Sequence, residues 1–370
     1  MTEFLDWLAA AARLRADRGL VRSTAVSPTG LLDLAGNDYL GLRTHPRVID
    51  AAVAAATAYG GGAGASRLVT GTLPVHAELE ERLAALTGSP AGLVFSTGYA
   101  ANLAAITALT DADTLLVSDA HIHASLVDAA RLSRATVAIS RHNDLGHVRE
   151  LLAGRSQRRA MVAVESVYSV LGDAAPLADL VELCRAHKAI LVIDEAHALG
   201  VVGDRGEGMA GELGITDAPD VVLTLTLSKS LGSQGGAVLA HPAVRDHLVN
   251  TARSFIYDTG LAPAAVGAAL GALDVLAEQP ALPKLCRDNS AALAEAIGVD
   301  QPAGAVLSRR MAGPDEALAA VDRAREGGIR IGCFRPPSTP DGSSRIRLTA
   351  HADHRDLTQA CAVLREIVRG

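Results

Sequence analysis

Hydrophobic and polar residues alternate along the chain with two different periods, which predicts strands and helices in turn. From about residue 46 to residue 265, short apolar and β-branched runs alternate with longer segments of helical periodicity. The expected helices span residues 46–59, 75–87, 99–109, 123–132, 145–153 and 177–188. The expected strands span residues 92–95, 114–117, 136–139, 160–165, 190–194, 221–227 and 236–240. Such alternation predicts an α/β fold with a mainly parallel central sheet and helices on both of its faces.

The segments on either side of this alternating region have patterns of their own. Residues 3–22 have the period of one amphipathic helix with arginines on its polar side, and residues 31–34 are typical of a short strand. After Pro263, an alanine-rich helix over residues 264–278 leads into mixed helices and strands. We therefore expect an N-terminal helix and arm (1–40), a large domain (41–265) and a smaller α+β C-terminal domain (266–370).

Composition narrows the classes of protein and of partner. The net charge is −7 and no block of basic residues occurs, so nucleic acid is not an expected partner. The four cysteines have neither metal-binding nor disulfide spacing, so we expect no metal site and a cytoplasmic location. The segment Met1–Asp6 carries acids where a signal peptide has bases, and no apolar run is long enough to cross a membrane.

One of the three lysines in the 370 residues lies in a setting that indicates chemistry. The apolar run 221–227 leads directly into Ser228 and Lys229, and a second apolar run, 190–193, ends in Asp194. The carboxyl ends of parallel strands meet at one edge of a sheet, so an amine and a carboxylate there can reach the same ligand. Lysine forms Schiff bases, and burial readily shifts its pKa. The pairing predicts pyridoxal phosphate (PLP) as the cofactor.

Two other ligands are excluded by missing sequence features. A helicase-type ATPase could also carry Asp194-Glu195-Ala196-His197 after a strand, but it needs a phosphate loop with a glycine before its lysine, earlier in the chain. No lysine precedes residue 188, and none of the three follows a glycine. The glycine-rich stretch 60–64 follows an expected helix rather than a strand, so it does not fit a dinucleotide-binding turn.

Further polar residues follow the expected strands, where they could surround a PLP molecule. Gly98 and Tyr99 open a helix after the strand that ends at Phe95, and a helix N-terminus attracts a phosphate group. Tyr99 and His123 are flat enough to lie against a pyridine ring. Asp194 would keep the pyridine nitrogen protonated, which makes the ring an electron sink. Ser169, Thr226 and His197 could form hydrogen bonds with the ring substituents and phosphate.

The order of these motifs resembles the α-oxoamine synthases, which are PLP-dependent transferases of fold type I, the aspartate aminotransferase-like fold. The motifs are Asn37-Asp38-Tyr39-Leu40-Gly41, Ser66-Arg67-Leu68-Val69-Thr70-Gly71, Ser96-Thr97-Gly98-Tyr99, His123-Ala124-Ser125, Asp194-Glu195-Ala196-His197 and Thr226-Leu227-Ser228-Lys229. The resemblance covers about residues 35–350.

The resemblance implies specific roles around the cofactor. Lys229 would be the Schiff-base lysine, with His123, Asp194 and His197 as the other catalytic residues. Asp194 would pair with the pyridine nitrogen, His197 with the phenolic oxygen, and His123 would stack on the ring. Cofactor contacts are implied for Gly98, Tyr99, His123, Ser169, Asp194, His197, Thr226, Lys229 and Thr259. Thr259 would reach the phosphate of a neighbouring subunit, so the resemblance also implies a homodimer.

The same resemblance implies the substrates. Arg335-Pro336-Pro337-Ser338-Thr339-Pro340 and Arg345-Ile346-Arg347-Leu348-Thr349 are most similar to family members that condense L-alanine with a pimeloyl thioester, carried by coenzyme A or an acyl carrier protein. Arg347 would hold the alanine carboxylate in a bidentate pair, near Asn37 and His123. Ser338 stands at a substrate-contacting position that is usually threonine. Arg18 or Arg22 would meet the far carboxylate of the pimeloyl chain.

Two alternatives remain open from the sequence alone. Glycine-using members, such as glycine C-acetyltransferase, share the lysine, aspartate and histidines, so those residues do not choose the amino acid. A catalytically silent PLP-fold subunit that serves only as a partner is the second alternative, although a silent site has no need to keep all four catalytic residues.

Overall fold

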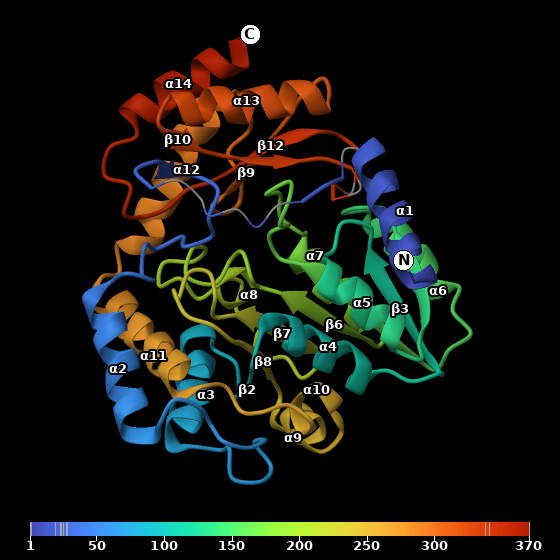
Figure 1. Ribbon diagram of the computed structural model, residues 1–370. Coiled ribbons are helices and arrows are strands. Elements are labelled where there is room, and N and C mark those ends of the chain that lie inside the picture. Colours follow the sequence, from blue (N-terminus) through green and yellow to red (C-terminus); the bar gives the residue numbers. More distant parts are fainter. Residues whose placement is uncertain are drawn as a thin grey trace. The chain divides into compact units, whose positions relative to one another are not determined.

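A seven-stranded sheet forms the centre of the computed structural model, which describes residues 2–18, 20–22, 24, 26, 29–336, 338–339 and 341–369 (Figure 1). The strands are β2 (Ala91–Phe95), β3 (Thr114–Asp119), β4 (Thr136–Ser140), β5 (Arg159–Glu165), β6 (Ala189–Asp194), β7 (Val221–Thr226) and β8 (Gly236–Ala240). They lie in the order β2-β8-β7-β6-β5-β3-β4, and only β8 runs antiparallel to its neighbours. The predicted strands and the mainly parallel sheet are thereby confirmed.

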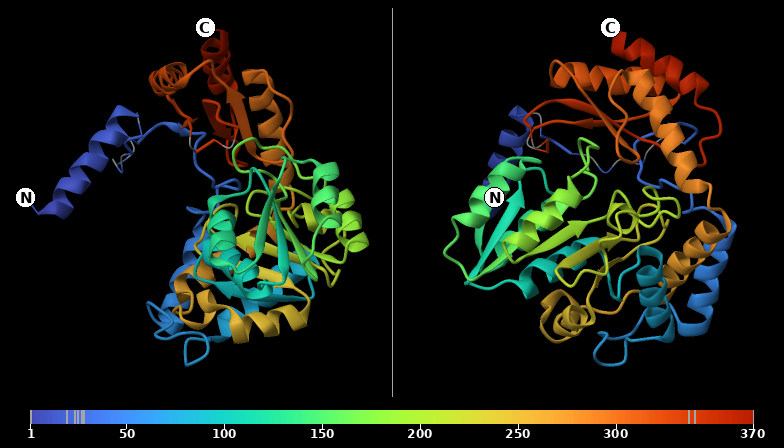
Figure 2. Two further views of the ribbon diagram at one scale, coloured as in Figure 1. Left: turned by 90° about the vertical axis from the view of Figure 1, so that its right-hand side faces the viewer. Right: turned by 180° about the vertical axis from the view of Figure 1, so that it is seen from behind.

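Helices cover both faces of this sheet, as Figure 2 shows. They are α2 (Pro46–Tyr59), α3 (Pro74–Thr87), α4 (Gly98–Leu109), α5 (Ala124–Leu132), α6 (Leu145–Ala153), α7 (Leu177–Ala186), α8 (Met209–Glu212), α9 (Pro242–Thr251), α10 (Arg253–Ile256) and α11 (Pro263–Glu278). Alternate residues of one strand enter different cores: Val162 and Val164 pack on one face, Met161 and Ala163 on the other. Except at the edge strand β4, whose residues Val137 and Ile139 are exposed, the strands are largely apolar because both faces of the sheet are covered.

The C-terminal part of the chain forms smaller sheets of its own. Its elements are α12 (Leu282–Ile297), β9 (Val306–Arg310), α13 (Pro314–Glu326), β10 (Ile329–Arg330), β11 (Gly332–Phe334), β12 (Arg345–Thr349) and α14 (Thr358–Arg369). Strands β11, β12 and β9 make an antiparallel sheet, and β1 (Leu32–Asp33) pairs in parallel with β10. The mixed helices and strands expected here are present; the domain boundary at residue 265 stays a prediction.

The chain divides into two units, residues 1–31 and residues 32–370, and the first contains the helix α1 (Glu3–Asp17). The predicted helix over residues 3–22 was too long, because α1 ends at Asp17 and Arg18 is its C-cap. The backbone N–H of Arg18 bonds to the carbonyls of Leu14 and Ala16 in a tightened last turn. Arg22 therefore lies beyond the helix.

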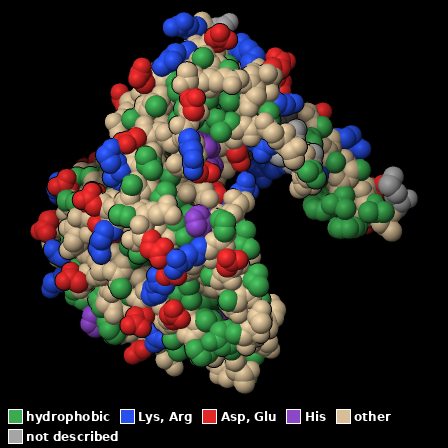
Figure 3. All heavy atoms as spheres, turned by 90° about the vertical axis from the view of Figure 1, so that its left-hand side faces the viewer, with side chains coloured by type: hydrophobic (Ala, Val, Ile, Leu, Met, Phe, Trp, Pro, Cys, Tyr) green, Lys and Arg blue, Asp and Glu red, His purple; other side chains and the backbone are tan. Residues whose placement is uncertain are grey.

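Charged side chains of both signs share the surface of the second unit. On the face drawn in Figure 3, lysine and arginine side chains are interspersed with aspartate and glutamate. No single sign of charge predominates on this face. None of the helices in the described residues is both long and apolar enough to cross a membrane.

A buried ion pair fixes the glycine-rich segment that precedes α3. Arg67 donates to Glu80 Oε1 at 2.9 Å, and their side chains are only 6% and 7% exposed. The same oxygen accepts from the backbone N–H of Val94 at 3.0 Å, so the pair joins this segment to α3 and β2. Removing one partner of such a pair leaves an uncompensated buried charge.

Replacement of Glu80 by alanine is therefore expected to lower the free energy of unfolding by about 3–5 kcal/mol, measured by urea denaturation. The matched control is Lys284→Ala, which breaks the exposed pair between Lys284 and Asp288. That control should cost less than about 1 kcal/mol. Equal losses in the two variants would contradict the argument.

Candidate active site

A cavity of about 260 Å³ lies where the carboxyl ends of β6 and β7 meet the N-termini of α4 and α5. It is lined by Thr97, Gly98, Tyr99, Asn102, His123, Ser125, Glu165, Asp194, Ala196, His197, Leu225, Thr226, Ser228 and Lys229. Seven of these residues were predicted as cofactor contacts: Gly98, Tyr99, His123, Asp194, His197, Thr226 and Lys229. The structure therefore brings residues predicted from four separate segments into one cavity.

The amine of Lys229 lies beside a histidine, just beyond the end of β7. Its Nζ atom is 2.8 Å from Nε2 of His197. Desolvation lowers the pKa of Lys229 to about 8, although the carboxyl groups of Asp194 and Glu165 act in the opposite direction. An amine with this pKa is neutral in a useful fraction of molecules near neutral pH, as a nucleophile or a base must be.

A tyrosine hydroxyl orients the ring of His197 from its other side. The hydroxyl of Tyr39 lies 2.6 Å from Nδ1 of His197 and 3.1 Å from Oδ1 of Asn37. Tyr39 is fully buried, and burial together with the Lys229 charge holds the pKa of His197 well below its ordinary value. His197 is therefore neutral, and its tautomer depends on which partner receives the hydroxyl proton of Tyr39.

The carboxyl group of Asp194 accepts hydrogen bonds from two N–H donors. The side-chain amide of Asn102 donates to Oδ2 at 2.8 Å, and the backbone N–H of Ala196 donates to Oδ1 at 2.9 Å. Asn102 also donates to Ser125, whose hydroxyl lies 2.7 Å from Nδ1 of His123. Asp194 is only 5% exposed, so its charge acts at short range in a medium of low dielectric constant.

The N-terminus of α4 forms the opposite wall of the cavity. Thr97 caps the helix by accepting from the N–H of Ala100 at 2.9 Å, and no acid lies in the first turn. A Cβ atom on Gly98 would lie 3.0 Å from Thr226 Cβ, so any other residue here would have to push α4 and β7 slightly apart. The hydroxyl of Tyr99 points to α5, where it donates to Asp128. The backbone N–H groups at the N-terminus of α4 are suited to binding an anion.

Arg347 and Asn37 come together near the cavity, as predicted. Nε of Arg347 donates to the carbonyl of Ser169 at 2.8 Å, and a terminal nitrogen donates to Asn37 Oδ1 at 3.3 Å. The guanidinium carbon also lies 5.4 Å from the ring centre of Phe334. Arg345, on the same strand, is paired with Asp341 at 2.5 Å and so has a structural partner. Of the two arginines on β12, Arg347 is therefore the one that contacts predicted site residues.

Other predicted residues lie outside the cavity lining. Ser169 meets the site through its backbone, and Thr259 pairs with Ser66 in an isolated β-bridge. Ser338 lies in a segment of which Pro337 and Pro340 fall outside the described residues. Arg18 and Arg22 belong to the first unit, so their part in the site stays a prediction.

Four buried polar residues of the site were not predicted: Tyr39, Asn102, Ser125 and Glu165. Tyr39 was quoted only as part of a motif, although a large aromatic residue in a turn rich in glycine needs a reason. Glu165 closes β5 as Asp194 closes β6, and the two are paired in parallel register. An acid at the end of a continuously apolar strand was the signal that could have found it.

A charged histidine fixes the loop that carries Ser169. Nδ1 of His142 bonds to Asp119 at 2.8 Å and Nε2 bonds to Asp173 at 2.7 Å. The ring of His121 stacks on His142 with the ring centres 3.8 Å apart. Burial opposes the charged form, but the hydrogen bonds to the two carboxylates raise the pKa of His142 to about 9. His142 is therefore an imidazolium ion that joins the end of β3 to this loop.

The His142 contacts predict a pH-dependent stability. A raised folded-state pKa gives stability that is full below the unfolded value, about 6.5, and is lost as pH rises through about 9. The difference in free energy of unfolding between the wild type and His142→Gln should therefore be largest below about pH 6.5 and shrink toward pH 9. Urea denaturation across this range measures it; a constant difference would contradict the charged state.

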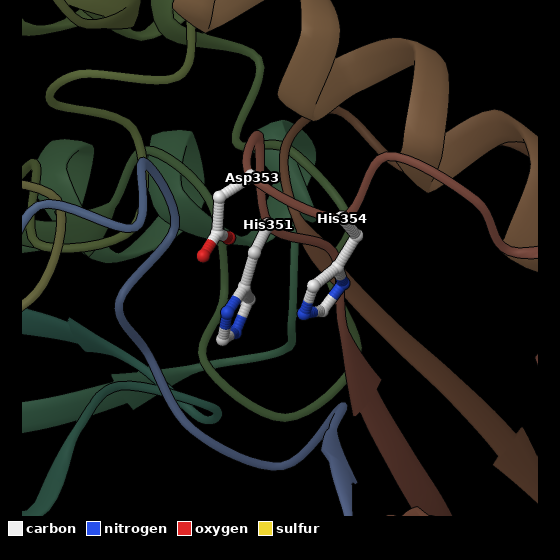
Figure 4. A group of neighbouring side chains, drawn as sticks. All are labelled: His351, Asp353 and His354. Atoms are coloured by element: carbon white, nitrogen blue, oxygen red, sulfur yellow. The ribbon is translucent and has the colours of Figure 1, made fainter.

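A second histidine group lies outside the cavity, after β12. Among the described residues, His351, Asp353 and His354 are the group whose ring nitrogens and carboxylate oxygens lie within 4.8 Å of one another (Figure 4). The two rings stack with centres 4.6 Å apart and planes inclined by only 15°, so their in-plane lone pairs do not converge on one point. Asn289 donates to the carbonyls of both histidines, which indicates a structural role for this turn.

Comparison with known proteins gives the context of this site. A family model described as aminotransferase class I and II matches residues 29–364. The 8-amino-7-oxononanoate synthase of Mycolicibacterium gilvum (strain PYR-GCK) is 54% identical over 361 residues, which cover 97% of this chain and 95% of that protein. The protein of the same name from Mycobacterium sp. (strain JLS) is 52% identical over 369 residues, 98% of this chain and 97% of the relative.

Solved structures agree with these relatives. A serine palmitoyltransferase from S. paucimobilis with a bound PLP–myriocin aldimine superposes with a TM-score of 0.90 at 26% identity, covering 100% of this chain and 98% of the other. An 8-amino-7-oxononanoate synthase from Francisella tularensis superposes with a TM-score of 0.80 at 25% identity, covering 92% and 98%. Both resemble this chain over nearly its whole length.

Proposed function

Because this chain belongs to the class I and II aminotransferase family and, within it, to the 8-amino-7-oxononanoate synthases, we propose that it condenses L-alanine with a pimeloyl thioester. The products would be 8-amino-7-oxononanoate, carbon dioxide and the free thiol carrier, in biotin biosynthesis. The chain is a PLP-dependent acyltransferase. The observation that carries the proposal is the Lys229 amine, held against His197 beside the buried carboxylate of Asp194.

The residues of the cavity fit PLP in three respects. Lys229 offers an amine that can bind the aldehyde covalently, and Asp194 offers a fixed negative charge for the pyridine nitrogen. The N-terminus of α4, at Gly98 and Tyr99, offers N–H groups for the phosphate, with Thr226 beside them. When bound, PLP supplies the electron sink that stabilises negative charge at the α-carbon of the amino acid.

The protein supplies the proton transfers and the orientation. Lys229, with its pKa lowered to about 8, is the base for the α-proton of alanine and returns a proton after carbon dioxide has left. Its neighbour His197 keeps the amine in place by a 2.8 Å hydrogen bond. His123, at the N-cap of α5, has its pKa lowered by burial, so it is neutral and suited to stacking against an aromatic ring.

The amino acid carboxylate is assigned to Arg347. Arg347 is 5% exposed and is held by Ser169 and Asn37, so little side-chain entropy is lost when a carboxylate binds. Asn37 and His123 would border the same carboxylate. Ser338 is proposed to contact the acyl substrate, and Arg18 or Arg22 the far carboxylate of the pimeloyl group, as the sequence resemblance implies.

We further propose a cytoplasmic homodimer. Thr259, beside the Gly60–Ser66 stretch, belongs to segments that resemble those building the partner's site in this family, and the bridge between Thr259 and Ser66 is consistent with a joint role. Asp258 accepts a hydrogen bond from Ser96, next to the phosphate wall, in place of the serine that is common there. The phosphate contact from this segment therefore falls to Thr259 alone.

The choice of substrate rests on sequence identity rather than on the fold. A serine palmitoyltransferase superposes on this chain at least as well as an 8-amino-7-oxononanoate synthase does, although the names of the two enzymes differ. Identity of 51–54% to synthases of one name over nearly the whole chain is what favours alanine and the pimeloyl group. The intact contacts between Lys229, His197 and Asp194 argue against a silent subunit.

Replacement of Lys229 by alanine should leave PLP bound without a covalent link and abolish turnover. The amine that forms the covalent link to PLP and removes the α-proton of alanine is then gone. Borohydride reduction followed by mass spectrometry should add PLP to the wild type and not to the variant. Lys188→Ala, a change at an exposed lysine after α7, is the control and should be labelled normally. Turnover at the wild-type rate in Lys229→Ala would contradict the assignment of the base.

The substrate pair is tested by incubating the protein with alanine, glycine or serine and with pimeloyl, acetyl, succinyl or palmitoyl thioesters. Mass spectrometry of the aminoketone should find 8-amino-7-oxononanoate from alanine and a pimeloyl thioester. Supplying the acyl group on coenzyme A and on acyl carrier protein in parallel identifies the carrier. Product from glycine and a short acyl group, with none from alanine, would assign a sister reaction.

A further inference from the structure

Glu165 is a buried carboxyl group of the cavity to which the proposed mechanism gives no task. It ends β5, is 2% exposed, and lines the cavity beside Asp194. Glu165 and Asp194 are direct partners in the parallel register of β5 and β6, so their side chains leave the sheet on the same face. Two carboxyl groups thus lie one strand spacing apart at the floor of the site.

The two oxygens of Glu165 have different surroundings. Oε2 accepts a hydrogen bond from the backbone N–H of Ser169 at 3.0 Å. Oε1 is buried and has no hydrogen-bond partner within the described part of the chain. A buried polar atom without a partner is destabilising unless a ligand satisfies it, and this atom belongs to a residue of the cavity wall.

The charges around Glu165 favour its protonated form. Burial raises the pKa of Glu165 to about 8, and the neighbouring charge of Asp194 acts in the same direction. The Lys229 ammonium group and the backbone amides of Ser169 and His123 act in the opposite direction, but less strongly. Since Oε2 accepts from an N–H group, the proton belongs on Oε1, the oxygen that lacks a partner.

We propose that Glu165 is a neutral carboxylic acid in this site and that its Oε1–H group donates a hydrogen bond to an anionic oxygen of the bound ligand. That oxygen is either the ring oxygen of PLP or the carboxylate of the amino acid. Glu165 is therefore a binding residue and not a general base. The inference rests on the proposed function only in taking PLP and an amino acid as the occupants.

Two replacements separate a neutral donor from a negative charge. Glu165→Gln keeps the shape and an N–H donor, whereas Glu165→Met keeps the volume and has neither donor nor charge. Each apoprotein is titrated with PLP, and each PLP complex is titrated with L-alanine and with glycine, by absorbance. We expect Glu165→Met to weaken one of these affinities by about tenfold or more, and Glu165→Gln to stay within about threefold of the wild type.

The two titrations identify which oxygen accepts the bond. Weaker PLP binding assigns the ring oxygen, and weaker amino acid binding with unchanged PLP affinity assigns the carboxylate; either supports the neutral donor. Equal losses in Glu165→Gln and Glu165→Met would show that the negative charge is required and would overturn the proposal. Wild-type affinities in Glu165→Met would overturn it as well.

The pH profile gives a readout that a merely structural role would not change. The donating form of Glu165 is lost as pH rises through about 8, so the affinity advantage of the wild type over Glu165→Met should shrink above that pH. The advantage of Glu165→Gln over Glu165→Met should persist, because an amide does not titrate. The charged form of Glu165 raises the pKa of Lys229, so the ratio of Glu165→Gln to Glu165→Met, in which residue 165 carries no charge, is the one that this interaction leaves unchanged.

Glu195→Gln is the matched control. Glu195 is also a buried glutamate, but its oxygens accept from the backbone N–H groups of Met209 and Ala210 and from the hydroxyl of Ser166. It does not line the cavity, so this variant should lose thermal stability and keep its PLP affinity.

The proposed function and the role of Glu165 can fail separately. If the wild-type protein gave no product in the condensation assay but bound PLP as expected, the proposed substrates would be contradicted and the role of Glu165 would stand.

Discussion

The parallel register of β5, β6 and β7 is the constraint on which the site depends. It places Glu165, Asp194 and Thr224 side by side at the carboxyl edge of the sheet, and Lys229 follows a few residues later. Parallel pairing requires a helical crossover between successive strands, so both faces of the sheet are covered and dry. Ionisable side chains at that edge therefore lie in a medium where a single neighbour changes their charge.

The ionisable groups of the cavity affect one another's pKa values, so no one of them can be considered alone. Burial lowers the pKa of Lys229 to about 8, and the neighbouring carboxylate of Asp194 opposes this shift. Asp194 is satisfied by N–H donors, whereas Glu165 has one oxygen without a partner in the described part of the chain. Burial and the nearby Asp194 raise the pKa of Glu165, and this difference in hydrogen bonding is consistent with the neutral Glu165 that we propose.

The sequence predicted the large sheet and the cavity well because both follow from local patterns. The runs of β6 and β7 are apolar and β-branched, and each leads into a polar residue at its carboxyl end. Parallel order brings those ends together, and Asp194 and Lys229 were found in this way. The bond between Tyr39 and His197 joins residues 158 positions apart, and no periodicity indicates such a pair. Asn102 was missed because a polar residue inside a helix next to a cap is ordinarily solvent-exposed.

The errors at the N-terminus have a different physical origin. The arginine-rich periodicity over residues 3–22 continues past the point where the backbone stops being helical, because side-chain pattern alone does not report where the last carbonyl groups find partners. The family resemblance predicted both Arg347 and Asn37 as substrate-binding residues, and the two are in contact. The contact of Ser169 with Arg347 is made by a backbone carbonyl, which no side-chain motif can reveal.

The residues that line the cavity all lie between Thr97 and Lys229, whereas the carboxylate-binding arginine is on the last strand, β12. The turn that carries Asn37 and Tyr39 is fastened to this end of the chain: Thr349 donates to the carbonyl of Gly36, and the N–H of Ala352 donates to that of Tyr39. During synthesis on the ribosome, the cofactor cavity therefore has all of its lining residues long before β12 exists. Asn37 and Tyr39 are among the first site residues to be made and the last to be held in place.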